Sequence, residues 1–389
     1  MTRDGVQILD GLSQVSAESW DALLDAGATP FMRHGFLESL ESSRCAAPRA
    51  GWTPRHLTLW RAGQLIAAAP AYVKNDSDGD FARDWDWASA AARAGIDYYP
   101  KLVLTVPFTP CTGKRLLVRP GESRARCIAQ LLAAARELCV EEGLSSLHVL
   151  FPDESEAQEL EAAGLALRCS FQFHWRNEGY RTPEEFLSRF SSKRRNMVRR
   201  ERAAPEKQGI ELHTIRGDEL RARTRECADN AYDLHRSTVD KLMWGKRWLN
   251  QDFYRRVFAA LPEHVELVEA RKGGKLIAGA FNVSSATRLY GRYWGCFEEH
   301  PFLHFNVCLY HSLDDCIARG LQVFEGGAGG EHKLGRGFLP ALTWSGHLFL
   351  DARLDSAVRD HLRAETVERQ RNIERFVSES PILKAEPSK

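Results

Sequence analysis

The sequence predicts an α/β protein made of two structural repeats, and three observations support this fold class. The segment GQLIAAA at residues 63–69 recurs as GKLIAGA at residues 274–280, each time between two apolar runs. Each copy is followed by a segment with apolar residues at helical spacing that stops at a glycine. A strand-like run follows each glycine. We therefore expect a strand, a tight turn and a strand, then a helix and a strand, in both halves of the chain.

Length and composition agree with two domains. A chain of 389 residues with 43% hydrophobic content can bury more than one core. We expect the boundary near residues 177–181, with one domain over residues 1–178 and a second over residues 179–389. The second domain includes a highly charged helical tail from about residue 355, which we expect to pack on that domain.

The first repeat is expected to open with amphipathic helices near residues 19–24 and 35–42, followed by the hairpin at 57–73. A helix over 123–142 and a strand over 146–151 complete the pattern.

Between the hairpin and that helix lies an aromatic stretch, Asp84-Trp85-Asp86-Trp87 and Tyr98-Tyr99-Pro100-Lys101. Three prolines between Pro100 and Pro110 exclude a regular helix there and favour extended segments. This stretch either shapes a pocket or packs between layers, and the residues alone leave both readings open.

The second repeat begins with a helix start signal. Thr182-Pro183-Glu184-Glu185 offers a capping threonine, a proline in the first turn and a glutamate three residues after the cap. The closing strand of the first repeat is expected over residues 171–175. In the second repeat, a helix over about 305–319 leads to a strand over 322–324.

Charge and cysteine content limit the functional classes. A net charge of +1 gives no global attraction to nucleic acid or membranes, so any such attraction must be local. The nine cysteines are scattered without a C-x-x-C pair, which argues against a disulfide framework and a thiolate zinc site. The N-terminus lacks the apolar core of a secretory signal, and no apolar run approaches the roughly 20 residues of a membrane span. We expect a soluble cytoplasmic protein with buried, reduced cysteines.

The concentrated basic block is the first chemical signal. Residues 193–207 contain seven basic and two acidic side chains, a local excess of five positive charges. If a new helix starts at Ser191 or Ser192, three cations occupy its first turn, where the helix dipole disfavours them and an anionic partner would offset the cost. If the helix runs on from Pro183, that reasoning does not apply. A solvated basic face is the alternative interpretation.

The second signal is a glycine-rich loop after a predicted strand, with six glycines in residues 326–337. It is neither a Walker A loop nor a G-x-G-x-x-G fingerprint. Glu331, His332 and Lys333 lie within it and offer a carboxylate, an imidazole and an ammonium group. Such groups can accept a proton from an attacking amine, return one to a leaving group and stabilise an oxyanion. A loop with solvated charges is the alternative.

Two further patterns in the sequence are weaker signals. His300 and His304 have metal-ligand spacing, but Pro301 disfavours the continuous helix that would align them, and we predict no metal site. Cations and aromatics alternate in Asp240-Lys241 and in residues 244–248, a mixture that suits nucleic-acid contact or simple packing. No G-x-S-x-G or H-E-x-x-H motif is present, so serine hydrolase and zincin mechanisms have no support.

These motifs resemble a known family. Tyr98-Tyr99-Pro100-Lys101, the run from Pro107 to Leu117 and above all Gly330-Glu331-His332-Lys333-Leu334-Gly335-Arg336-Gly337-Phe338-Leu339-Pro340 look like the bacterial FemAB-like "peptidoglycan biosynthesis/recognition" family, over about residues 30–375. The resemblance implies two tandem N-acetyltransferase-fold (GNAT) domains, each a mixed, mostly antiparallel sheet flanked by helices. It also implies transfer of an amino acid from aminoacyl-tRNA to an amine on a peptidoglycan precursor.

The predicted site follows from this resemblance together with the two signals. We expect Glu331 or His332 to be the base and Lys333 to stabilise negative charge. Substrate contacts are expected from Tyr99, Lys101, Thr109, Tyr293, His304 and Arg336. Phosphate contacts to tRNA are expected from Lys193, Arg194, Arg195, Arg199, Arg200, Lys246 and Arg247.

The expected donor is aminoacyl-tRNA as a co-substrate, with no tightly bound cofactor and no DNA partner. Acetyl-CoA users of this fold place a glycine-containing loop before the helix that receives the pyrophosphate. The equivalent residues 296–304 contain no glycine and two glutamates. A CoA-dependent N-acyltransferase and a non-catalytic module that binds cell-wall fragments or RNA are the two alternatives. The coiled-coil arm of some Fem relatives has no counterpart, because no heptad pattern is visible.

Overall fold

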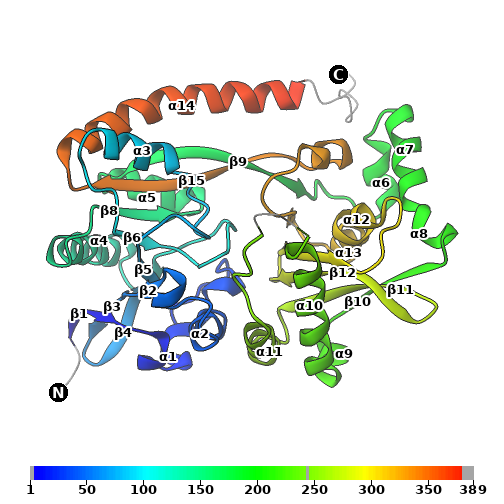
Figure 1. Cartoon of the computed structure of the whole chain (residues 1–389), viewed down its shortest axis with the longest axis horizontal. Coiled ribbons are helices and arrows are strands. Elements are labelled where there is room, and N and C mark those ends of the chain that lie inside the picture. Colours follow the sequence, from blue (N-terminus) through cyan, green and yellow to red (C-terminus); the bar gives the residue numbers. More distant parts are fainter. Residues whose placement is uncertain (1–3, 242–244, 379–389) are drawn as a thin grey trace. The chain divides into compact units, whose positions relative to one another are not determined.

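The structure is a computed structural model that describes residues 4–241 and 245–378. It contains two compact units, which we describe separately (Figure 1). The first comprises Met1–Ser170 with Leu342–Arg371, and the second comprises Phe171–Ala341 with Asn372–Lys389. In the described residues no helix combines the length and the apolar character that a membrane span would need.

The first unit has two groups of paired strands. One is an antiparallel sheet in the order β1-β3-β4-β7, and the other has the order β15-β8-β6-β5-β2. The strands are β1 (Gly5–Leu9), β2 (Thr53–Pro54), β3 (His56–Arg61), β4 (Gln64–Ala69), β5 (Ala71–Lys74), β6 (Lys101–Leu104), β7 (Leu117–Val118), β8 (Ser146–Leu150) and β15 (Leu339–Phe349). The helices are η1 (Leu12–Gln14), α1 (Ala17–Asp21), η2 (Pro30–Met32), α2 (His34–Ser42), η3 (Pro48–Ala50), α3 (Trp85–Arg93), α4 (Arg124–Glu141), α5 (Glu154–Ala162) and α14 (Ala352–Ser378).

The second unit has one sheet with the order β10-β11-β12-β13-β14-β9. Its strands are β10 (Ile210–Ile215), β11 (Val265–Lys272), β12 (Lys275–Ser284), β13 (Arg288–Cys296), β14 (Val323–Glu325) and β9 (Ala166–Arg176). Its helices are α6 (Pro183–Ser188), α7 (Ser192–Arg202), α8 (Ala204–Lys207), α9 (Gly217–Ala222), α10 (Thr224–Val239), α11 (Gln251–Ala260), α12 (Leu303–Phe305), a π-helical segment η4 (Asn306–Tyr310), α13 (His311–Ala318) and the 3₁₀ turn η5 (Glu331–Arg336). β9 and β15 contain residues of both units.

The predicted repeat is present in both units. The β3–β4 and β11–β12 hairpins turn through two residues with positive φ, Ala62-Gly63 and Gly273-Gly274, which is the backbone of a type I′ turn. Each hairpin also has an irregular register just before the turn. Each unit then has one parallel strand pair, β6 with β8 and β13 with β14, whose connection includes a helix. The two helices end before glycines of positive φ, as predicted, at Gly143 and Gly320.

Apolar residues at the predicted helical positions form the cores. In the first unit, Ile128, Leu131 and Leu132 of α4 pack with the inner faces of β3, β4, β6 and β8. In the second unit, Leu313 and Ile317 of α13 join a core with β9, β14 and α6. None of the nine cysteines, which all lie in the described residues, forms a disulfide; eight are buried and Cys308 is half-buried.

The prediction for the tail helix was wrong about the domain on which it packs. Leu354, Val358 and Leu362 of α14 are buried in a cluster with Trp87 of α3 and Phe349 of β15, all in the first unit. The strand β15 brings the chain back to that unit because its residues 345–349 pair with β8. Sequence order alone had assigned residues 342–371 to the second domain.

Candidate functional site

The basic block forms a separate helix and does not continue the helix that begins at Pro183. The helix α6 begins at the predicted cap, where the Thr182 side chain accepts a hydrogen bond from the Glu185 amide. It ends at Ser188, and α7 then starts at Ser192 after the cap residue Ser191, whose Oγ accepts a hydrogen bond from the Arg194 amide at 3.4 Å. Lys193, Arg194 and Arg195 therefore occupy the first turn of α7, which contains no acidic residue.

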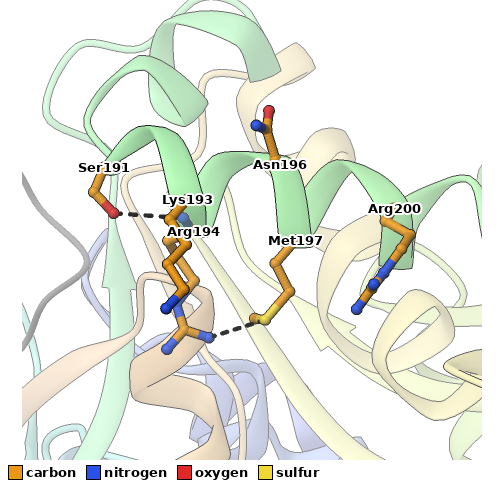
Figure 2. A pocket seen from close by; sticks show the side chains of 6 residues that line it. All are labelled: Ser191, Lys193, Arg194, Asn196, Met197 and Arg200. Carbon is orange, nitrogen blue, oxygen red and sulfur yellow. Dashed lines mark hydrogen bonds between the residues drawn. The ribbon is translucent and has the colours of Figure 1, made fainter.

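A basic pocket lies along α7 (Figure 2). It has a volume of about 630 Å³ and is lined by Ser191, Lys193, Arg194, Asn196, Met197 and Arg200. In Figure 2 the cationic side chains and Met197 extend to the same side of the helix, whereas Asn196 points to the other side. The Arg194 guanidinium contacts the Met197 sulfur, with Nη1 to Sδ at 3.6 Å.

The cations of this helix have few internal partners. Arg202 pairs with Asp314 of α13. Within residues 4–241 and 245–378, no carboxylate lies within salt-bridge distance of the other five, which are Lys193, Arg194, Arg195, Arg199 and Arg200. Lys193, Arg194 and Arg195 lie at the end of the helix where the dipole disfavours cations, so an anion bound there would stabilise them.

The remaining predicted phosphate contacts lie elsewhere in the second unit. Arg247 is exposed and pairs with Asp240 through Nε and Oδ1 at 2.6 Å. Lys246 is exposed as well. Trp244, which belongs to the same sequence pattern, lies outside the described residues.

A cavity opens where β13 and β14 part. Their parallel pairing covers only Arg288–Tyr290 and Val323–Glu325. Beyond these residues β13 continues to Cys296, whereas the segment after β14 forms the glycine-rich loop. The cavity has a volume of about 300 Å³. It is lined by Ala280, Asn282, Gly291, Arg292, Tyr293, Trp294, His304, Cys308, Leu309, Gly326, Gly327, Ala328, Gly329, Gly330, His332 and Lys333.

Two of the three predicted catalytic residues reach this cavity. His332 and Lys333 lie in the turn η5 and line it, whereas Glu331 is exposed and does not. Burial, and then the positive charges of Lys333 and Arg336, lower the pKa of His332 below its ordinary 6.5. The imidazole is therefore neutral at pH 7, and it can act as a base.

Lys333 is held rigidly beside His332. Its side chain is 5% exposed, and its Nζ donates to the carbonyl oxygens of Gly327 and Gly329 at 2.7 and 2.8 Å. Burial lowers the pKa of Lys333 to about 8. The ammonium form still predominates at pH 7, and two of its three N–H donors are used by the loop.

Two predicted substrate contacts also line the cavity. The His304 ring packs edge-on against Trp294 at 4.8 Å and lies 5.9 Å from the His332 ring. Burial, and then the nearby positive charges, lower the pKa of His304 to about 4. The Tyr293 ring stacks against His235 of α10 at 4.2 Å.

Arg336 lies beside the cavity and does not line it. Its guanidinium, in a side chain that is 8% exposed, donates to Glu201 Oε2 and to the His332 carbonyl, both at 2.8 Å. The guanidinium carbon also lies 3.3 Å from the centre of the Phe305 ring.

The predicted substrate contacts of the first unit are Tyr99, Lys101 and Thr109. Lys101 is fully buried, and its ammonium is held by Asp84 at 2.6 Å and Asp80 at 2.9 Å. Burial alone would lower the pKa of Lys101, but the two carboxylates outweigh it and raise that pKa. Thr109 is buried and donates to the Pro107 carbonyl, and the half-buried Tyr99 shares a hydrogen bond with Ser77.

The segment where CoA users bind pyrophosphate is already occupied by internal bonds. Glu298 pairs with Lys275 at 2.7 Å and Glu299 with Lys241 at 3.4 Å. The amide of Leu303, at the start of the helical segment, donates to the His300 carbonyl. This loop therefore presents two carboxylates and a used amide where a phosphate would need free donors.

The two histidines of the predicted metal pattern have separate neighbours. His300 faces Glu298 at 3.7 Å, and His304 packs on Trp294. In the described part of the chain, no group of three histidine, cysteine or carboxylate side chains is arranged to hold a metal ion.

Sequence reasoning missed several residues around the site, among them Glu201, Asn282 and Cys308. Asn282 and Cys308 line the cavity, and no sequence signal marked them. Glu201 is buried on α7 and contacts Arg336. The available signal for Glu201 was its position as an acidic residue within a basic block, which indicates an internal cationic partner.

Comparisons with known proteins agree with this description. The chain matches the FemAB-like family, described as peptidoglycan biosynthesis/recognition, over residues 11–384. No curated protein matches the chain.

Among solved structures, FemX is similar with a TM-score of 0.50 at 13% identity, covering 89% of this chain and 98% of that chain. The C-terminal domain of a putative lysylphosphatidylglycerol synthetase from Agrobacterium fabrum has a TM-score of 0.51 at 8% identity, covering 89% and 95%. A tandem GNAT protein from the clavulanic acid biosynthesis pathway has a TM-score of 0.44 at 13% identity, covering 88% and 98%. The predicted α/β fold class, with sheets flanked by helices, is confirmed. The match over nearly the whole length shows that this chain belongs to the FemAB-like family.

Proposed function

We propose that this chain is a Fem-type acyltransferase that moves an aminoacyl group from aminoacyl-tRNA to an amine acceptor. Its family and fold class are those of acyl- and aminoacyltransferases. The observation that carries the proposal is the position of His332 and Lys333 on a cavity between two parting strands. A neutral imidazole and a cation on one cavity are the groups that amide-bond formation needs.

The proposed reaction uses both side chains. The acceptor amine attacks the ester carbon of the donor, a C–N bond forms, and the C–O bond to the ribose breaks. His332 takes the proton that the amine loses and returns it to the leaving ribose oxygen. Lys333 stabilises the oxyanion with the N–H that its two loop carbonyls leave over. Glu331 has no part in this step because it does not line the cavity.

The five unpaired cations of α7 support tRNA as the carrier of the donor group. Three of them, Lys193, Arg194 and Arg200, line the pocket of about 630 Å³, and all five lie in the first or last turn of the helix, where they offer a surface for backbone phosphates. Exposed Lys246 and Arg247 are proposed to add further phosphate contacts. We propose no DNA partner and no tightly bound cofactor. A tRNA donor would place the reaction in the cytoplasm.

The acceptor is proposed to be an amine on a peptidoglycan precursor, as the family description suggests. Tyr293 and His304 are retained as substrate contacts because they line the cavity, and Tyr99 is retained as a half-buried candidate. The polar atoms of Lys101 and Thr109 are buried in internal bonds, so we assign them no substrate contact.

A transfer assay with labelled aminoacyl-tRNA and a muropeptide precursor tests the proposal. We expect labelled amide product, and no binding of acetyl-CoA in titration calorimetry. The transfer rate should rise with pH below pH 6.5, where His332 loses its proton and becomes a base. It should fall again near pH 8, where Lys333 loses the proton that makes it a cation. Tight acetyl-CoA binding would replace the donor with a CoA ester. If His332→Gln leaves biological activity intact while Arg199→Ala with Arg200→Ala abolishes it, the chain is a binding module.

A further inference from the structure

Glu201 is the one acidic residue of α7, and it is buried. Its Oε2 accepts a hydrogen bond from the Tyr310 hydroxyl at 2.6 Å and another from Arg336 Nη2 at 2.8 Å. Its backbone carbonyl accepts a bond from Asn306 Nδ2 at 2.9 Å. One residue of the basic helix thus bonds to two other segments of the second unit.

These two segments are the walls of the cavity. Tyr310 and Asn306 belong to the π-helical segment that continues from α12, and this wall contributes His304, Cys308 and Leu309 to the lining. The other wall is the turn η5, which contributes His332 and Lys333.

Arg336 connects Glu201 to His332, the proposed base, by hydrogen bonds to both residues. Its Nη1 donates to the His332 carbonyl at 2.8 Å, so the backbone of the base is fixed through Arg336 to Glu201. Between the walls themselves, the Phe305 ring lies 5.6 Å from the His332 ring, and the Arg336 guanidinium lies against the rings of Phe305 and Tyr310. Glu201 joins both walls by hydrogen bonds, to Tyr310 and Asn306 on one side and to Arg336 on the other.

Stability is a poor reason for this arrangement. A buried ion pair gains little over apolar packing of the same volume, because both charges lose their hydration. A π-helical segment is also rare and occurs mostly at functional sites. A carboxylate that fixes two walls at once is better explained by the geometry that it imposes.

We propose that Glu201 is a positioning residue that orients His332 across the cavity through Arg336 and Tyr310. This inference rests on the proposed function, in which His332 is the base. It also gives α7 two roles, since the helix with the unpaired cations carries the residue that sets the cavity walls. At the other end of α7, the Arg194 guanidinium lies against Gly335 of the same turn, where a Cβ would be 3.3 Å from Nη1.

The test compares Glu201→Gln and Glu201→Ala with a matched control, Asp314→Asn. Asp314 also binds an arginine of α7, Arg202, but it does not line the cavity. The first readout is the NMR signal and titration of the His332 ring, which needs no substrate. In the wild-type protein, the Phe305 ring should shift the NMR signal of the His332 ring. We expect this shift to disappear in both Glu201 variants and to remain in Asp314→Asn.

The second readout is binding and transfer with aminoacyl-tRNA. We expect Glu201→Gln to change the affinity for tRNA less than twofold and to lower the transfer rate at least tenfold. If Glu201→Ala does not fold, Tyr310→Phe, which removes one of the two side-chain bonds, should show a smaller change of the same kind. An unchanged His332 signal in folded Glu201→Gln would overturn the positioning role alone. Absence of transfer in the wild-type protein would instead count against the proposed function.

Discussion

Removing a cation from α7 should have opposite effects on protein stability at the two ends of the helix. Lys193 is exposed in the first turn, where the positive end of the helix dipole repels it, and Arg200 is exposed in the last turn, where the dipole attracts it. Each interaction is worth about 0.3–1 kcal/mol at a surface. Lys193→Gln should therefore stabilise the free protein by that amount, and Arg200→Gln should destabilise it by the same amount.

In a unit of this size, such changes shift the melting temperature by about 1–4 °C, upward for Lys193→Gln and downward for Arg200→Gln. Differential scanning calorimetry at low ionic strength measures both shifts, and added salt should reduce them.

Both substitutions should weaken tRNA binding equally, because each removes one phosphate contact. The five cations of α7 should contribute about −4.5 to the slope of log affinity against log salt, and four should contribute about −3.6. Between 50 and 200 mM salt, the contribution of α7 to the affinity should then fall about 500-fold in the wild type and about 150-fold in either variant. Filter binding at four salt concentrations gives the slopes. Shifts of melting temperature in the same direction would refute the dipole argument, and a flat salt response would refute the assignment of α7 as the phosphate-binding helix.

Three further predictions address the rest of the chain. His332→Gln should lower the transfer rate about 10²–10⁴-fold, whereas Glu331→Gln should leave it within threefold, as steady-state assays would reveal. Gly295→Ala should lower the free energy of unfolding by about 3 kcal/mol, because a Cβ there would lie 1.7 Å from a carbonyl oxygen of α10. Gly291→Ala, whose Cβ would have its nearest atom at 3.4 Å, should lower that free energy by less than about 1 kcal/mol, as urea unfolding would measure. Lys101→Met should cost about 3–5 kcal/mol, since it leaves two buried carboxylates unpaired, and calorimetry showing no loss of stability would contradict the buried cluster.

Local sequence signals predicted the elements well where a single segment contains the physical cause. The paired positive-φ turns at residues 62–63 and 273–274, the cap at Thr182 and the start of α7 at Ser191 all depend on neighbouring side chains or on glycine. The apolar spacing of α4 and α13 likewise fixed which faces would be buried.

The candidate site was only partly predictable because its members come from distant segments. Glycines and polar residues in sequence pointed to His332 and Lys333, yet nothing in the sequence distinguished them from Glu331, which does not line the cavity. Lys101 and Arg336 looked like ligand contacts because they are charged and lie in family motifs. Their charges are instead neutralised by carboxylates that are distant in sequence.

The sequence by itself determined the repeat, the helix and strand periods, and the concentration of positive charge on one helix, since each depends on residues close together in the chain. Tertiary structure alone decided where β13 and β14 part, which side chains meet at the resulting cavity, and on which unit α14 packs. Long-range strand pairing sets these features, because a register or an ion pair between distant segments depends on both partners at once.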